Sequence, residues 1–203
     1  MSNTAIIIAG GVGSRMHYDI PKQFVNVNDK PIIIYTLWVV SGGSSAQESI
    51  RNGVFNLEGK CEPDDIIIIH DGIRPLVDDA VLSDVIVKCR QYGNAVTSLP
   101  YNEQIFIIDD DISTTRYIPR ETLRRVSTPQ AYKFSLLSEK YHEAFDRGIG
   151  IHGSSYANTM MADLGVRLYF AAGSDKNIKL TTPDDLELFK SFVRREGGNL
   201  YGI

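Results

Sequence analysis

Short runs of β-branched residues alternate along the chain with segments whose apolar positions have helical spacing. The runs at 4–9 and 65–70 end in glycine-rich or acidic loops, a pattern typical of buried parallel strands. Shorter runs predict further strands over 95–99 and 166–171, and apolar spacing predicts helices over 78–92, 134–145 and 183–194. The pattern therefore predicts an α/β fold, in which ligands bind beyond the carboxyl ends of the strands.

One segment departs from this alternation. Residues 104–109 and 114–118 predict a β-hairpin around the acidic turn Asp109-Asp110-Asp111. Such an arm, spanning about residues 101–119, is a candidate interface element.

Size and charge narrow the class of protein. With 203 residues and 43% hydrophobic content, we expect a single domain over residues 1–203. A net charge of -4 argues against nucleic acid or an anionic membrane as partner. No apolar run approaches the roughly 20 residues that span a bilayer. The two cysteines have no metal-ligand spacing, and we expect a cytoplasmic protein.

The loop after the first strand has the composition of a phosphate-binding loop. Glycines let backbone N–H groups approach a phosphate closely, and two cations that follow can neutralise its charge. The residues are Ala9, Gly10, Gly11 and Gly13, with Arg15 and Lys22 behind them. The spacing fits neither a dinucleotide fingerprint nor a Walker loop. A glycine turn that merely lets the strand end tightly is the alternative.

Polar residues in three other segments are candidates for the same site. Asp71 follows the isoleucine-rich strand and is a natural Mg²⁺ ligand, although a turn-forming role beside Gly72 is the alternative. Lys179 ends a polar loop and could meet phosphates, or could be a solvated lysine. The arginines at 120, 124 and 125 form a basic cluster that could bind an anion.

The order of these motifs resembles that of the cytidylyltransferases that make CDP-alcohols, the group that contains 2-C-methyl-D-erythritol 4-phosphate and ribitol-5-phosphate cytidylyltransferases. The resemblance extends over nearly the whole chain. The matching segments are Ala9-Gly10-Gly11-Val12-Gly13-Ser14-Arg15-Met16, Pro21-Lys22-Gln23-Phe24, Gly42-Gly43 with Ser49-Ile50, His70-Asp71-Gly72-Ile73-Arg74-Pro75, Thr128-Pro129-Gln130, and Asn177-Ile178-Lys179 with Thr182-Pro183-Asp184-Asp185-Leu186.

This resemblance implies a Rossmann-like, mostly parallel sheet flanked by helices, with a projecting β-arm that forms a homodimer. It implies catalytic roles for Arg15, Lys22 and Lys179 on the triphosphate of CTP. The nucleotide would be bound by Ala9, Gly10, Gly11, Gly13, Gly43, Ser44 and Ser49. The alcohol phosphate would contact Asp71, Arg74, Gln104, Arg120 and Thr128, some of them across the dimer interface. Mg²⁺ would be the cofactor, bound by Asp71.

Several positions depart from the family pattern. Ala46 stands where an arginine is common, Gln104 where the arm has a threonine, and Lys176 where an acidic residue is usual, so that Asp175 becomes the candidate second Mg²⁺ ligand. The acidic stretch of the family is also eroded at 155–159. In addition, a segment of roughly thirty residues that the family has is missing between Leu37 and Trp38, and we expect that the natural chain contains it.

The sequence leaves several candidates for the alcohol substrate. Ala9-Gly10-Gly11, Ala46 and Gln104 favour a polyol phosphate, first ribitol 5-phosphate for cell-wall or capsule polymers. The alternatives are 2-C-methyl-D-erythritol 4-phosphate for isoprenoid synthesis, a sugar phosphate, and a catalytically silent nucleotide-binding subunit.

Overall fold

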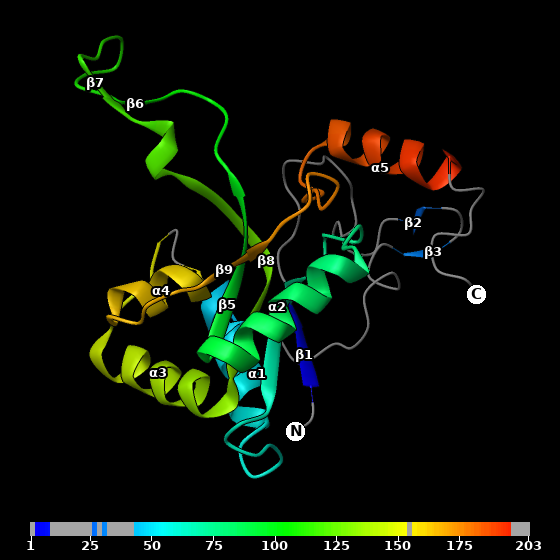
Figure 1. Cartoon of the computed structure of the whole chain (residues 1–203), viewed down its shortest axis with the longest axis vertical. Coiled ribbons are helices and arrows are strands. Elements are labelled where there is room, and N and C mark those ends of the chain that lie inside the picture. The colour runs from blue at the N-terminus through cyan, green and yellow to red at the C-terminus, as the bar shows by residue number, and fades with distance from the viewer. Residues whose placement is uncertain (1–2, 9–25, 28–29, 32–42, 154–155, 196–203) are drawn as a thin grey trace.

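The computed structural model describes residues 3–8, 26–27, 30–31, 43–153 and 156–195. Its centre is a five-stranded sheet in the order β1-β4-β8-β5-β9 (Figure 1). The strands are β1 (Asn3–Ile8), β4 (Ile66–Asp71), β5 (Asn94–Pro100), β8 (Arg124–Lys133) and β9 (Phe170–Ala172). β1 is parallel to β4 and β5 to β9, while β8 is antiparallel to both of its neighbours. Four of these strands therefore share one direction, and the predicted α/β sheet is confirmed with β8 as the reversed strand.

The sequence pattern does not predict the central strand β8. Pro129 lies inside it, and proline is normally excluded from central strands because it has no N–H to donate. The structure accommodates this residue at an irregularity, where the register with β5 shifts between Val96 and Thr97. Thr128 and Pro129 lie opposite this shift, so the irregular point of the sheet is also a candidate site position.

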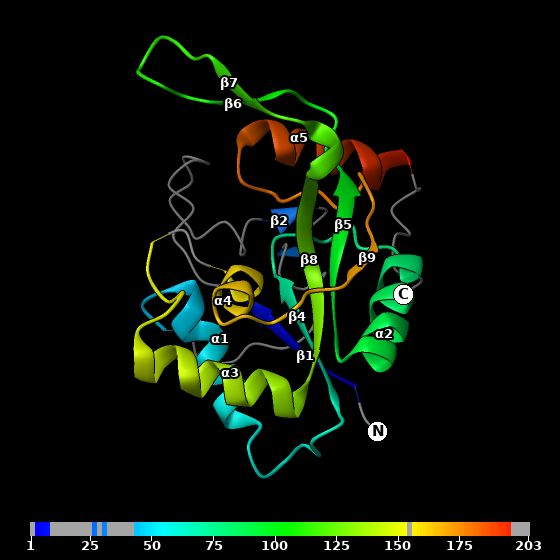
Figure 2. The same cartoon turned by 60° about the vertical axis from the view of Figure 1, so that its left-hand side comes forward.

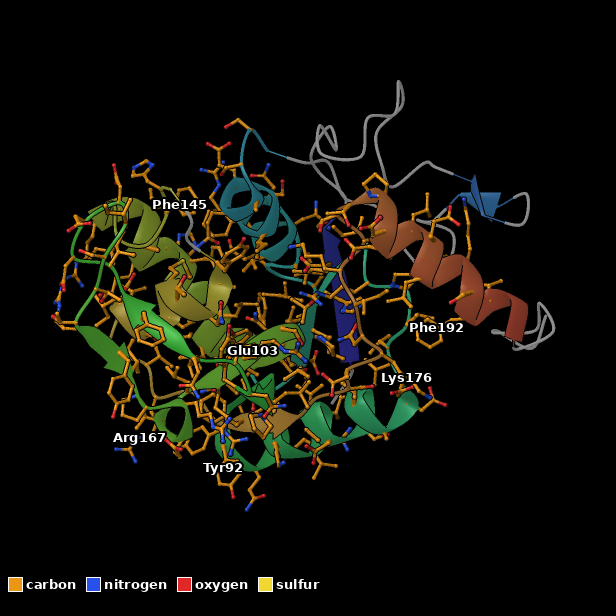
Figure 3. All side chains as sticks on the ribbon, turned by 90° about the horizontal axis from the view of Figure 1, so that it is seen from above. Tyr92, Glu103, Phe145, Arg167, Lys176 and Phe192 are labelled. Carbon is orange, nitrogen blue, oxygen red and sulfur yellow. The ribbon has the colours of Figure 1, made fainter. Side chains whose placement is uncertain are left out.

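Helices cover both faces of the sheet, as the alternation within β4 requires. Ile67 and Ile69 pack into a core with α1 (Ala46–Asn56), α3 (Phe134–Arg147) and α4 (Ala157–Asp163). Ile66 and Ile68 pack on the opposite face with α2 (Asp79–Tyr92). Figure 3 shows Phe145 of α3 and Tyr92 of α2 on opposite sides of the sheet. Each face of β4 thus has its own apolar core.

A third apolar cluster anchors α5 (Pro183–Arg195) beside the carboxyl end of β4. Ile73 and Leu76, which follow β4, pack against Leu180 and Phe189. The Asp185 carboxylate accepts hydrogen bonds from the backbone N–H groups of Thr181 and Thr182, a capping arrangement that fixes where the helix begins. The loop that carries Lys179 is therefore held against the turn that follows Asp71.

Two small antiparallel pairs complete the described chain. The strands β2 (Asn26–Val27) and β3 (Lys30–Pro31) form one pair. The other consists of β6 (Ile105–Ile107) and β7 (Arg116–Ile118), the predicted hairpin, which projects away from the sheet (Figure 2). A 3-10 turn at Arg120–Thr122 connects β7 to β8. None of the described helices is long and apolar enough to cross a membrane.

Candidate active site

Two cations converge on one carboxylate where β4 ends. The Asp71 Oδ2 atom lies 3.0 Å from Arg74 Nε and 3.2 Å from Lys179 Nζ, and the Asp71 side chain is only 15% exposed. Burial alone would raise the pKa of Asp71, but the charges of Lys179 and Arg74 outweigh it and hold that pKa below its usual value. The cluster therefore contains one anionic and two cationic side chains, with a net positive charge at the edge of the sheet.

Thr128 and Asn177 tie this cluster to β8. The Asp71 backbone N–H donates to Thr128 Oγ1 at 3.0 Å, and Asn177 Nδ2 donates to the Thr128 carbonyl at 2.6 Å. Arg74 Nη1 donates to the Asn177 carbonyl at 2.7 Å. Residues that are far apart in the sequence are thus joined by direct hydrogen bonds, and the predicted site residues Asp71, Arg74, Thr128 and Lys179 lie together.

A cavity of about 250 Å³ opens beside this cluster. Its lining includes Asp71, Arg74, Thr128 and Lys179, which the sequence indicated, and Tyr156, to which the sequence assigned no role. The Lys179 ammonium lies 5.6 Å from the centre of the Tyr156 ring, within the range of a cation–π interaction. Tyr156 falls in the stretch where the family's acidic pattern is eroded, and that departure was the available signal.

Three of the residues that the resemblance assigns to the nucleotide, Gly43, Ser44 and Ser49, lie at the start of α1. The Gly43 N–H donates to Ser49 Oγ at 2.9 Å, and Ser44 N–H donates to Glu48 Oε2 at 2.7 Å. A Cβ on residue 43 would lie 2.3 Å from Glu48 Cβ, so glycine is required there by the close approach. Ile50, one residue after Ser49, lines the cavity, so this segment lies next to the charged cluster.

Asp175, the candidate second Mg²⁺ ligand, is on an adjoining cavity. This cavity of about 240 Å³ shares Arg74 and Lys179 with the first one. The Asp175 carboxylate pairs with Arg125, and both side chains are exposed. Within the described residues no three His, Cys, Asp or Glu side chains group closely enough to hold a metal ion by themselves.

Gln104 and Arg120 lie apart from the cluster, at the base of the hairpin. Both are exposed, and neither lines either of the two cavities. Arg120 Nη1 donates to the Asn102 carbonyl at 3.3 Å and thus joins the two ends of the hairpin. Within one chain, these two predicted substrate contacts do not meet the others.

The glycine loop lies outside the described residues. This applies to Ala9, Gly10, Gly11 and Gly13 and to the two cations Arg15 and Lys22, whose roles stay predictions. The junction of Leu37 and Trp38 also lies outside them, so the missing segment stays a prediction as well. An intact mass of the natural protein that matched 22.6 kDa would contradict it.

His70 supports the cluster from within the sheet. It is buried, and its Nε2 lies 2.9 Å from the Arg74 carbonyl, to which it donates. Its Nδ1 is buried and has no hydrogen-bond partner within the part of the chain that the structure describes. Burial lowers the pKa of His70, although the Arg74 carbonyl and Asp71 oppose the shift. A neutral His70 fits the interpretation of a packing residue that also fixes the turn before Arg74.

An α/β sheet with a positively charged cavity at its strand ends defines a domain that binds phosphate groups. Comparison with known proteins identifies the family of this domain. Residues 36–195 match the IspD family, described as 2-C-methyl-D-erythritol 4-phosphate cytidylyltransferase. This chain belongs to that family of cytidylyltransferases.

Two curated relatives show the range of the family. A ribitol-5-phosphate cytidylyltransferase of Lacticaseibacillus paracasei is 57% identical, with 95% of this chain and 98% of that protein covered. A 2-C-methyl-D-erythritol 4-phosphate cytidylyltransferase of Syntrophus aciditrophicus is 30% identical, with 97% of each chain covered. The relatives of this chain therefore include one enzyme named for ribitol 5-phosphate and one named for 2-C-methyl-D-erythritol 4-phosphate.

Solved structures agree with the fold. The 2-C-methyl-D-erythritol 4-phosphate cytidylyltransferase of Thermus thermophilus superposes with a TM-score of 0.76 at 23% identity, over 96% of this chain and 100% of that one. The Francisella tularensis enzyme of the same name gives 0.77 at 20% identity, over 94% and 99%. At these identities the likeness concerns the fold alone.

Proposed function

We propose that this protein is a cytidylyltransferase that joins CTP to ribitol 5-phosphate, forming CDP-ribitol and pyrophosphate. The observation that carries this function is the convergence of Arg74 and Lys179 on Asp71 beside the cavity at the end of β4. The choice of ribitol 5-phosphate is supported by the 57% identity to a ribitol-5-phosphate cytidylyltransferase. Such a product would serve cell-wall or capsule polymers and would be made in the cytoplasm.

The chemistry requires positioning and charge neutralisation more than a strong base. A phosphate oxygen of the alcohol phosphate forms a bond to the α-phosphorus of CTP, while the bond to the bridging oxygen of the β-phosphate breaks and pyrophosphate leaves with the electron pair. A phosphate monoester is already anionic near neutral pH, so no side chain has to remove a proton. Arg74 and Lys179 would hold the two anions together, and Lys179 would neutralise charge that develops at the α-phosphate.

We propose Mg²⁺ as the cofactor, because the donor set fits an ion that takes few protein ligands. Mg²⁺ binds through one or two carboxylates together with substrate phosphate oxygens, and Asp71 provides one carboxylate beside the cavity. Asp175 is the proposed second ligand, and it would have to leave Arg125. When bound, the ion would withdraw charge from the triphosphate and help pyrophosphate to leave.

CTP would lie between the start of α1 and the charged cluster. We propose that Gly43, Ser44 and Ser49 contact the cytosine, and that the glycine loop with Arg15 and Lys22 holds the triphosphate. The close packing of Gly43 on Glu48 supports a preformed nucleotide side, because it fixes the backbone that would face the base.

A homodimer built through the hairpin would complete the alcohol site. Phe106, Ile108, Ile112 and Tyr117 of the hairpin are exposed, with Ile108 at 75% and Ile112 at 96%. Apolar side chains at this exposure gain free energy when a second copy covers them. We propose that the partner's hairpin brings Arg120 and Gln104 to the cavity, which explains why they lie apart from it in one chain.

The test measures Mg²⁺-dependent release of pyrophosphate from CTP with a panel of alcohol phosphates. We expect ribitol 5-phosphate to give the highest kcat/KM. A preference for 2-C-methyl-D-erythritol 4-phosphate would favour the alternative substrate, which the family description and the relative at 30% identity support. Turnover with sugar phosphates alone, or CTP binding without turnover, would contradict both and favour a sugar-phosphate enzyme or a silent subunit.

A further inference from the structure

A closed set of hydrogen bonds links the residues around the cavity. Starting at Asp71, the contacts run to Thr128 (3.0 Å), from Thr128 to Asn177 (2.6 Å), from Asn177 to Arg74 (2.7 Å) and from Arg74 back to Asp71 (3.0 Å). Three of these residues have proposed roles as ligands of phosphate or metal. Asn177 is the exception, because it is only 4% exposed and lines the adjoining cavity but not the first one.

The orientation of the Asn177 amide is fixed by its partner. The Thr128 carbonyl can only accept a hydrogen bond, so the atom that faces it must be the donor Nδ2. The amide oxygen then points into the protein, where Oδ1 is buried and has no partner within the described part of the chain. Within the described residues, the Asn177 side chain therefore contributes to the fold through its Nδ2 atom alone.

A second buried asparagine, Asn94, shows what a purely structural amide does here. Its Nδ2 donates to the Arg167 carbonyl at 3.0 Å and its Oδ1 accepts from the Tyr169 N–H at 3.2 Å. Both atoms are used, and the residue holds the segment that leads into β9 away from either cavity. Among the residues that the structure describes, Asn177 uses one amide atom only, and it uses that atom on the backbone of Thr128.

We propose that Asn177 is a positioning residue, which couples Thr128 to Arg74 so that the two groups keep a fixed separation around the alcohol phosphate. The inference rests on the proposed function for its consequence in catalysis. The Asn177 side chain holds Thr128 on β8, and the Asn177 carbonyl holds the Arg74 guanidinium after β4. Without the amide, Thr128 and the loop at 174–179 lose their direct hydrogen bond beside the cavity.

The kinetic test compares Asn177→Ala with Asn94→Ala. We expect Asn177→Ala to raise the KM for ribitol 5-phosphate on the order of tenfold, since misplacement of a binding group weakens substrate contacts. The KM for CTP should change little. Asn94→Ala should lower the melting temperature and leave the KM for ribitol 5-phosphate as in the wild type. Equal effects of both variants on that KM would overturn the proposal.

A double-mutant cycle identifies the path of the effect. If Asn177 acts by holding Thr128, Asn177→Ala should cost little in kcat/KM once Thr128→Val has removed the hydroxyl, so the two losses are not additive. Additive losses would mean that Asn177 acts elsewhere and would overturn the proposal.

A measurement without turnover separates this proposal from the proposed function. The Asp71 N–H donates to Thr128 Oγ1, so a looser Thr128 should expose this amide to hydrogen exchange. We expect faster exchange at Asp71 in Asn177→Ala and unchanged exchange there in Asn94→Ala. Unchanged exchange in both variants would overturn the coupling, whatever the substrate, whereas faster exchange in an enzyme that rejects ribitol 5-phosphate would keep the coupling and refute the substrate.

Discussion

The cluster at the end of β4 and the β6–β7 hairpin are organised in opposite ways. The cluster is partly buried, and hydrogen bonds join its residues across β4, β8 and the loop before α5. The hairpin is exposed, and its ordered contacts are local: Asp109 binds Arg116 and Thr115, and Asp110 binds Ser113. The contacts of the cluster are formed within a single chain, whereas the hairpin exposes apolar side chains. Under the proposed function, the cluster of each protomer would bind the phosphates, and the dimer would close the alcohol site.

The largest expected effect comes from the charged cluster at the end of β4. Lys179→Ala removes a cation that lies 3.2 Å from Asp71, and we expect turnover to fall by a factor on the order of a hundred, as with other positioned electrostatic donors. Lys22→Ala should act similarly if the glycine loop holds the triphosphate. The matched control is Lys176→Ala, which removes an exposed lysine from the same loop as Lys179. Near-normal pyrophosphate release from both Lys22→Ala and Lys179→Ala would contradict the assignment.

The next effect tests whether the hairpin acts across an interface. Arg120→Ala and Lys179→Ala should each be poorly active alone, because each lacks one residue of every site. Mixed in equal amounts and allowed to exchange, they should recover about one quarter of the wild-type sites, since half of the dimers are hybrids and each has one complete site. Pyrophosphate release after mixing measures this recovery.

A variant at the tip provides the matched control for the mixing experiment. Ile112→Asp places a charge on the most exposed apolar residue of the hairpin and should shift the protein toward monomer in light scattering. Complementation should then disappear. Wild-type activity of the monomeric Ile112→Asp variant, which keeps both Arg120 and Lys179, would show that Arg120 acts within its own chain.

A smaller effect is expected at Gly43, which packs tightly on Glu48 at the start of α1. Gly43→Ala brings a Cβ within 2.3 Å of Glu48 Cβ, so the backbone must move away from the start of α1. We expect the KM for CTP to rise about tenfold as Gly43 loses its hydrogen bond to Ser49, which converts to about 1.4 kcal/mol. The KM for ribitol 5-phosphate should stay as it is. Gly59→Ala, where φ is 73° and no atom lies near the added Cβ, is a control for backbone strain outside the site, and it should lower the melting temperature without changing the KM for CTP.

The smallest effect concerns stability and pH. Burial lowers the pKa of His70 from its ordinary value of 6.5, so the unfolded chain takes up a proton that the folded chain excludes. His70 therefore contributes stability above about pH 6.5 and loses that contribution as the pH falls below it. Each kcal/mol lost should lower the melting temperature by about 2–4 °C.

His70→Gln isolates the pH-dependent contribution of His70 to stability, because glutamine can donate to the Arg74 carbonyl and does not titrate. We expect a smaller drop in melting temperature between about pH 7.5 and 5.5 in this variant than in the wild type. A drop of equal size in both proteins would assign the acid sensitivity to other groups.

Most of the regular elements could be predicted from the sequence, because apolar periodicity reflects burial directly. The end of α2 is an example: Gly93 adopts φ 89°, the left-handed conformation that favours glycine, within one turn of the last buried apolar position, Cys89. α1 was not predicted, since it contains Asn52, Gly53 and Asn56, which are weak helix formers, and its stability comes from packing on the sheet. β8 was not predicted because Pro129 is typical of a break.

The site was predictable only in part, because it depends on contacts between distant segments. The closeness of Asp71 and Arg74 could be predicted from the sequence, because the two residues are three positions apart. The approach of Lys179 could not be derived from spacing, and the resemblance supplied it. The pairing of Asp175 with Arg125 and the use of one Asn177 amide atom depend on three-dimensional distances, for which the sequence gives no signal.

The reversed strand β8 has a consequence for how this enzyme can diverge. It begins two residues after the 3-10 turn at the base of the hairpin and carries Thr128 at its fifth position, so the length of chain between Arg124 and Thr128 sets which way the threonine hydroxyl points. Adding or removing one residue there would turn Thr128 to the opposite face of the sheet. A change of length at the tip of the hairpin would leave this threonine in place, whereas a change of length at its root would alter how Thr128 faces the cavity.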